Sequence, residues 1–152
     1  MQYLGLRCWP DHFTYVVVQG TVSAPVPITS GSVKIPADAD RPAFLNWIST
    51  EVRTLIKRHT PTHCSYKAIE PAAQKNSSLL RRSQVEGVVQ AVVYESGCRR
   101  IASYTKQQIK SRLGFEGAAK DVANALDAGP LREFSGTACE ESALAAWASL
   151  PD

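Results

Sequence analysis

The sequence predicts an α/β domain with a central mixed sheet that is led by a three-stranded antiparallel portion and carries helices on both faces. Two observations support this fold class. The chain opens with an apolar hairpin pattern, YLGLRCWPDHFTYVVV, and a third strand follows. Helical and extended patterns then alternate after residue 40. With 152 residues the chain can bury a self-sufficient core, so we expect one domain over residues 1–152.

The antiparallel portion is predicted from β-branched and aromatic runs separated by turn residues. We expect hairpin strands at Tyr3–Leu6 and Phe13–Gln19, joined by a short turn. Thr21–Ile35 contains several prolines and glycines, which favours a loop with the third strand around Ser32–Ile35.

The first helix is expected at residues 41–58, where apolar side chains recur at helical spacing. Asp38 and Asp40 precede Pro42, which is typical of a capped helix start with proline in the first turn. Pro61 ends the helical pattern, and a strand is expected at Ser65–Ile69.

A second long helix is predicted at Ser77–Ser96, and Gly97 follows it where a left-handed residue is favoured. Gly87 lowers helix propensity in its middle, so we expect another element to approach closely there. A short strand at Arg100–Ser103 and a last helix from about Thr137 complete the order.

Composition and charge exclude several classes of protein. The net charge of +3 permits a nucleic-acid partner without requiring one. The apolar runs are shorter than the roughly 20 residues that cross a bilayer, and no signal-peptide pattern is visible, so we expect a cytoplasmic protein that does not bind membranes. The four cysteines show no Cys-x-x-Cys pair, which indicates reduced thiols rather than a zinc site or a disulfide framework.

Residues 68–122 carry a set of motifs that resembles the RuvC family of Holliday-junction resolvases, which have a ribonuclease H-like architecture. AIEPAAQKNSSLLRRSQVEGVVQAV contains a strand end Ile69-Glu70, a Lys75-Asn76 loop, and a helix with Gln84 and Gly87. IASYTKQQIKSRLGFEGAAKDV is similar to the family's third motif, from Lys110 through Gly114 and Gly117 to Lys120. The opening hairpin matches the family's first motif without a gap, and the fit is weakest between Gly20 and Asp40.

The resemblance implies a cluster of carboxylates that holds two divalent cations for phosphodiester cleavage. Of these positions only Glu70 keeps its carboxylate. Arg7 stands at the first acidic position, and Cys139 and Ser142 stand at the two acidic positions of the last helix. A guanidinium cannot bind a cation, so we assign no metal site and no catalytic residue, and we expect no cofactor.

We interpret Arg7 as a replacement for the metal that pairs with Glu70 across neighbouring strand ends. In the alternative reading, Arg7 points to solvent and Glu70 is a surface carboxylate. Cys8 and Cys139 flank the family's metal site, and a thiol pair between them is a weaker hypothesis.

The resemblance also implies a nucleic-acid surface. The family's third motif has two lysines that face nucleic acid, and Lys110 and Lys120 occupy these positions. Lys75, Arg81 and Arg112 are further candidates for phosphate contacts.

Three classes of function follow. The preferred one is a pseudonuclease that binds branched or duplex DNA, expected as a homodimer. The second is an active magnesium-dependent endodeoxyribonuclease in which Asp11, Glu140 or Glu141 rebuilds a metal site with Glu70. The third is a protein-interaction scaffold with neither activity nor DNA contact.

Overall fold

The structure, a computed structural model, describes residues 1–34 and 39–152 and contains one five-stranded sheet. β1 (Tyr3–Cys8), β2 (His12–Gly20) and β3 (Pro25–Lys34) are successive antiparallel neighbours. β4 (His63–Lys67) and β5 (Arg100–Tyr104) continue the sheet on the other side of β1 as parallel strands, in the order β3-β2-β1-β4-β5. The predicted mixed sheet with an antiparallel leading portion is therefore confirmed.

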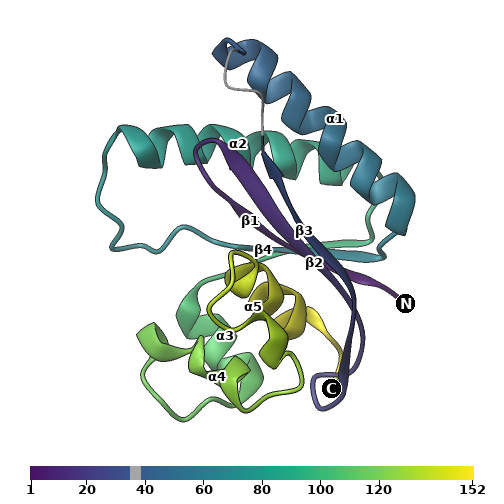
Figure 1. Cartoon of the computed structure of the whole chain (residues 1–152), viewed down its shortest axis with the longest axis vertical. Helices are drawn as coiled ribbons and strands as arrows, with labels where there is room; N and C mark the ends of the chain where they lie inside the picture. The colour runs from purple at the N-terminus through teal and green to yellow at the C-terminus, as the bar shows by residue number, and fades with distance from the viewer. Residues whose placement is uncertain (35–38) are drawn as a thin grey trace.

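Helices cover both faces of this sheet (Figure 1). α1 (Arg41–His59) and α2 (Ser77–Glu95) lie together on one face. α5 (Glu140–Ser149) packs on the other face, accompanied by α3 (Lys106–Leu113), α4 (Asn124–Asp127) and the short 3-10 turns Ala119–Asp121 and Arg132–Phe134. None of the helices in residues 1–34 and 39–152 has both the length and the apolar character that a bilayer crossing needs.

The alternation of side chains along β1 divides the core into two clusters. Leu4, Leu6 and Cys8 join the cluster under α1 and α2, while Tyr3 joins the cluster under α5. Gly5 shares the face of Tyr3, and a Cβ there would meet the Ser142 carbonyl oxygen at 2.1 Å. The backbone of α5 thus lies directly on the middle of β1, which no larger residue would permit.

The start of α1 agrees with the sequence pattern. The Asp40 side chain accepts a hydrogen bond from the Ala43 amide at 2.9 Å, and Pro42 lies in the first turn. Asp38 and Ile35, which also entered the sequence prediction, lie outside the described residues. At the other end of the helix, Lys57, Arg58 and His59 occupy the last turn, where positive charge is favourable.

Several predicted strand boundaries differ from the observed ones by one or two residues, such as the end of β1 at Cys8 rather than Leu6, and two further differences are informative. β3 begins at Pro25 rather than near Ser32, because it is an edge strand, where prolines that lack an amide donor are tolerated. β4 ends at Lys67 rather than at Ile69, so Glu70 lies in the loop after the strand. This loop position gives Glu70 different partners from those expected at a strand end.

The expected close approach at Gly87 was also wrong, because a Cβ at this position of α2 would meet no atom within 4 Å. We therefore predict that Gly87→Ala raises the free energy of unfolding by about 0.5–1 kcal/mol, since alanine restricts the unfolded chain and favours the helix. Urea denaturation measures this difference. Gly5→Ala is the contrasting variant and should strongly destabilise the fold; an unchanged or lower stability for Gly87→Ala would contradict the prediction.

Candidate functional site: a charge cluster at the ends of β1 and β4

Arg7 is directed to the α5 side of the sheet because it shares the strand face of Tyr3 and Gly5. Its side chain is only 11% exposed. Nε donates to the Glu141 carboxylate in the first turn of α5, and Nη1 donates to the Cys8 carbonyl. The guanidinium carbon also lies 4.2 Å from the centre of the Trp9 ring.

The predicted pairing of Arg7 with Glu70 is wrong, since Arg7 pairs with Glu141 instead. Glu70 accepts a hydrogen bond from Lys67 Nζ at 2.5 Å and another from the Lys106 amide at 2.9 Å. The physical reason is that β4 ends before Glu70, and the loop turns the carboxylate toward the start of α3.

Lys67 is the least exposed cation of this region, with 3% of its side chain accessible. It lies at the end of β4, and its Nζ also donates to the Ala68 carbonyl at 2.7 Å. Burial lowers the pKa of Lys67, although the carboxylates of Glu70 and Glu141 oppose this shift. Sequence reasoning missed Lys67; the one available signal was a lysine at the end of an otherwise buried strand.

A third cation and a third carboxylate reach the same place from α2. Arg82 and Glu86 are separated by one helical turn, with Nη2 and Oε2 3.8 Å apart, and both side chains are largely buried. Arg82 Nη2 donates to the Lys67 carbonyl at 3.0 Å. Burial raises the pKa of Glu86, and the charges of Arg82, Arg7 and Lys67 counteract this rise. Sequence reasoning missed Glu86 as well, because helical spacing alone does not show that a glutamate faces the sheet.

We refer to these six residues as the charge cluster: Arg7, Lys67 and Arg82 with Glu70, Glu86 and Glu141. Their formal charges balance, with three cations and three carboxylates. Burial would raise the pKa of Glu141, but Arg7, Lys67 and Lys106 together outweigh burial and hold it below the ordinary value. The pKa of Glu70 is likewise lowered, because Lys67 and the Lys106 amide together outweigh burial.

The other two positions where the resemblance implies a carboxylate, Cys139 and Ser142, lie just before α5 and on it. Ser142 is fully buried, and its hydroxyl lies 2.7 Å from that of Thr14 on β2. Cys139 precedes α5, and its Sγ lies 3.6 Å from the Gly31 carbonyl oxygen. Cys8 faces the α1 and α2 side of the sheet, and Cys139 packs against the α5 side, so the hypothesis that they pair was wrong.

Two candidate rescue carboxylates point away from the charge cluster. Asp11 is 82% exposed and pairs with the neighbouring His12 at 2.6 Å. Glu140 accepts a hydrogen bond from the Gly136 amide at 2.7 Å. Among residues 1–34 and 39–152, no three or more His, Cys, Asp or Glu side chains are grouped so as to hold a metal ion.

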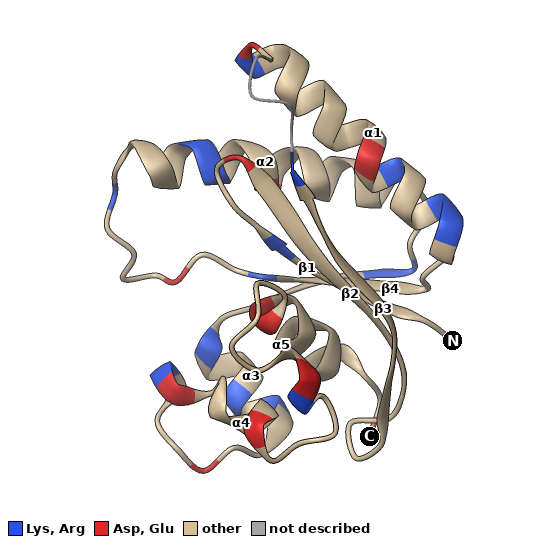
Figure 2. Cartoon of the chain, viewed as in Figure 1, with Lys and Arg blue, Asp and Glu red and all other residues tan. Residues whose placement is uncertain are grey.

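Some of the residues predicted to contact DNA lie around the end of the sheet that carries the charge cluster. Figure 2 shows basic residues on the loop before α2, on the first half of α2 and on α3. Lys75 and Arg81 are exposed, Lys110 lies in the last turn of α3, and Lys120 follows in the turn Ala119–Asp121.

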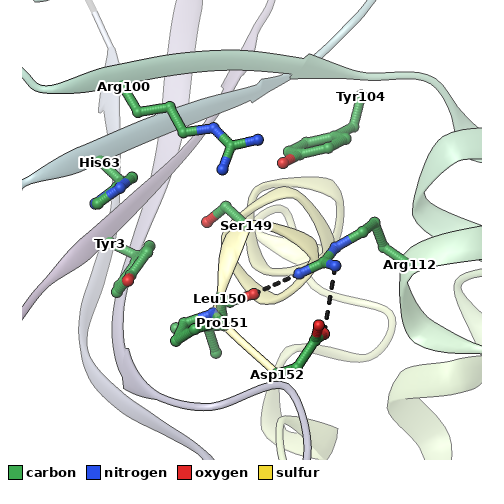
Figure 3. Close-up of a pocket in the computed structure, with 9 residues that line it drawn as sticks. All are labelled: Tyr3, His63, Arg100, Tyr104, Arg112, Ser149, Leu150, Pro151 and Asp152. Carbon is green, nitrogen blue, oxygen red and sulfur yellow. Dashed lines mark hydrogen bonds and ion pairs between the residues drawn. The ribbon is translucent and has the colours of Figure 1, made fainter.

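Arg112 differs from these residues because its guanidinium forms hydrogen bonds and an ion pair within the protein. It donates to the carbonyls of Ala148 and Leu150 at 3.0 and 2.6 Å, and it pairs with Asp152 at 3.3 Å. Figure 3 shows it at the wall of a separate cavity of about 450 Å³, across from Arg100 and Tyr104. The last residues of the chain are thereby attached to α3.

The mixed sheet in the order β3-β2-β1-β4-β5, with helices on both faces, is the ribonuclease H-like architecture. The family model of crossover junction endodeoxyribonuclease RuvC matches residues 4–126. This chain belongs to the RuvC family.

A curated relative supports this assignment. The crossover junction endodeoxyribonuclease RuvC of Paraburkholderia phymatum is 33% identical over 95 residues, which are 62% of this chain and 51% of the relative. The matched part of the chain thus spans about half the length of that relative.

Solved structures show the same fold at low sequence identity. RuvC of Thermus thermophilus in complex with a Holliday junction substrate has a TM-score of 0.75 and 18% identity, with 97% of this chain and 91% of that chain covered. The yeast mitochondrial Holliday junction resolvase Ydc2 has a TM-score of 0.59 and 16% identity, with 96% and 76% covered.

The side chains of the charge cluster do not fit the pair of divalent cations that the family resemblance implies. Each carboxylate already has a cationic neighbour, and the permanently charged Arg7 stands at one of the ligand positions. Ser142, where the resemblance implies a carboxylate, has a buried hydroxyl that is bonded to Thr14.

We predict that Glu141→Gln lowers the free energy of unfolding by about 1–3 kcal/mol, because it leaves the largely buried Arg7 without its counter-charge. Chemical denaturation at neutral pH measures the effect. Glu95→Gln is the matched control, since Glu95 forms an exposed pair with Arg53 and its loss should cost less than about 0.5 kcal/mol. Equal effects of the two substitutions would contradict the importance of the Arg7 pair.

The same pair predicts a pH dependence. Because the pKa of Glu141 is lower in the folded protein than in the unfolded chain, its contribution is fully present above the unfolded pKa and is lost as pH falls through the folded pKa. The stability difference between wild type and Glu141→Gln should therefore be largest near neutral pH and shrink on acidification. Denaturation curves between neutral pH and the range where glutamate titrates test this; a constant difference would contradict it.

Proposed function

We propose that this RuvC-family chain binds branched or duplex DNA without metal-dependent cleavage. The observation that carries this proposal is the charge balance of the cluster, in which Arg7, Lys67 and Arg82 offset Glu70, Glu86 and Glu141. A site that attracts divalent cations needs an excess of negative charge and free carboxylate oxygens.

The magnitude of the repulsion supports this view. Two unit charges 4 Å apart interact by about 4 kcal/mol at an effective dielectric constant of 20, and a divalent ion doubles that value. Arg7 keeps its charge at any relevant pH, so a metal cannot enter beside Glu141 unless the guanidinium moves away. Moving it would break the contacts with Glu141 and the Cys8 carbonyl and the stacking on Trp9.

DNA binding does not depend on the cluster, because phosphate contacts need only accessible cations. Lys75, Arg81, Lys110 and Lys120 are the candidates, and they provide affinity that is independent of sequence and sensitive to salt. Relatives support the choice of DNA: the Thermus thermophilus RuvC structure includes a Holliday junction substrate. A homodimer is part of this proposal, since α2 exposes Leu80 and Tyr94, at 69% and 79%, to a potential second chain.

An active nuclease is the second candidate, and one observation favours it. The carboxylates of Glu70 and Glu141 both raise the pKa of Lys67. Two carboxylates therefore lie near the same ammonium group, although cations separate them. Its relatives are named crossover junction endodeoxyribonucleases. In this reading Lys67 and Arg7 withdraw when metal and DNA bind together.

We predict that the wild-type chain binds a synthetic four-way DNA junction without cleaving it in the presence of Mg²⁺ or Mn²⁺. Gel-shift and denaturing-gel assays on the same samples separate binding from cleavage. Calorimetric titration with Mn²⁺ should show no tight site. Metal-dependent cleavage that Glu70→Gln abolishes would establish the nuclease reading instead, and absence of both binding and cleavage would favour an interaction scaffold.

We predict that Lys110→Ala combined with Lys120→Ala weakens junction binding by about tenfold and reduces its salt dependence, because two phosphate contacts are lost. Fluorescence anisotropy at several salt concentrations measures both quantities. Lys57→Ala with Arg58→Ala removes the same charge from the far end of α1 and serves as the control. Equal weakening by the two double variants would mean that only net charge matters.

A further inference from the structure

Two cysteines that sequence spacing did not connect lie side by side at the other end of the sheet. The Sγ atoms of Cys64 and Cys98 are 3.2 Å apart. Cys64 is the second residue of β4, and Cys98 lies in the turn between α2 and β5. Parallel pairing of His63 with Arg100 and of Cys64 with Ile101 brings the two segments together. The arrangement therefore follows from the sheet register and not from sequence proximity.

The environments of the two sulfurs differ. His63 points into the cavity of Figure 3 on the α5 side, so strand alternation turns Cys64 to the opposite face, where it is 2% exposed. Cys98 is half-buried and lines an open cavity of about 320 Å³ with Arg53, Lys57 and Gly97. Only Cys98 is therefore accessible from solvent.

The hydrogen bond between the thiols makes their acidities unequal. The Cys64 thiol and nearby backbone groups lower the pKa of Cys98 and outweigh its partial burial. The pKa of Cys64 is raised by that same interaction and by burial. An accessible sulfur with a lowered pKa, 3.2 Å from a shielded sulfur with a raised pKa, is the arrangement of an attacking and a resolving thiol.

The other two cysteines have no such arrangement. Cys8 is 1% exposed, and burial raises its pKa to about 12. Burial also raises the pKa of Cys139, whose Sγ donates to the Gly31 carbonyl and has no second sulfur beside it among the described residues. These two residues therefore serve as internal references for reactivity.

We propose that Cys64 and Cys98 form a peroxide-reactive dithiol that is oxidised to an intramolecular disulfide. The Cys98 thiolate attacks the O–O bond of a hydroperoxide; an S–O bond forms, the O–O bond breaks, and the departing oxygen leaves as alcohol or water after protonation. The Cys64 sulfur then attacks the resulting sulfenic acid, forming the S–S bond and releasing water. The two thiols together lose two protons and two electrons, and the hydroperoxide accepts both and is reduced to alcohol, or water, and one further water.

The geometry requires little movement for the second step. The sulfurs must approach from 3.2 Å to the disulfide bond length of about 2.05 Å. The new bond closes the segment from Cys64 to Cys98, which contains the end of β4, Glu70 and the whole of α2. Cross-linking this loop restricts the unfolded chain, so oxidation should raise the thermal midpoint of the protein.

The test is oxidation of the reduced full-length chain with hydrogen peroxide, followed by mass spectrometry under non-reducing conditions. We expect a loss of two hydrogens per chain, a Cys64–Cys98 linked peptide and a higher thermal midpoint that a dithiol reductant reverses. Cys64→Ser should stop at a sulfenic acid on Cys98 that dimedone traps. Cys98→Ser should form no disulfide, whereas Cys139→Ser should behave as wild type.

A second measurement needs no variant and so does not depend on whether the serine variants fold. In the reduced wild-type protein, iodoacetamide should alkylate Cys98 at least about tenfold faster than Cys8 or Cys64. Slower or equal alkylation of Cys98, disulfides that involve Cys8 or Cys139, or over-oxidation of Cys98 without a bond to Cys64 would each overturn the proposal. DNA binding takes no part in either measurement, so these outcomes are independent of the proposed function.

Discussion

The ion pair between Arg7 and Glu141 joins residues 134 positions apart in the chain, at the end of β1 and the start of α5. Its existence depends on the contact of α5 with Gly5, which brings the first turn of the helix over the strand end. With Arg7 bound to Glu141, the other two ion pairs of the cluster are local ones, Lys67 with Glu70 across the end of β4 and Arg82 with Glu86 along α2. The Arg7–Glu141 pair is the member of the cluster that ties α5 to the end of β1.

Much of the architecture was predictable because its signals are local. The helix start at Asp40, the long α2 and the hairpin strands all follow from capping residues and from the spacing of apolar side chains. The extent of β3 was not predictable, since the tolerance of Pro25 and Pro27 depends on the strand lying at the edge of the sheet. Edge position is a property of the whole topology.

The candidate site was predictable only as a set of positions. The motif resemblance predicted that Arg7 and Glu70 lie at the same end of the sheet, but it did not specify the partner of either residue. The pairing depends on where β4 ends and on which faces of α2 and α5 meet the sheet, so Lys67 and Glu86 could not be recognised from spacing. The adjacency of Cys64 and Cys98 was hidden for the same reason, because it arises from strand register.

The charge balance has a consequence for the substitutions that the chain tolerates at residue 7. If Arg7 alone were replaced by an aspartate, two cations would face four carboxylates in a partly buried volume, and Ser142 would still supply no ligand. This single change would therefore lower the stability of the fold. An acidic residue at this position would need a compensating change elsewhere in the cluster.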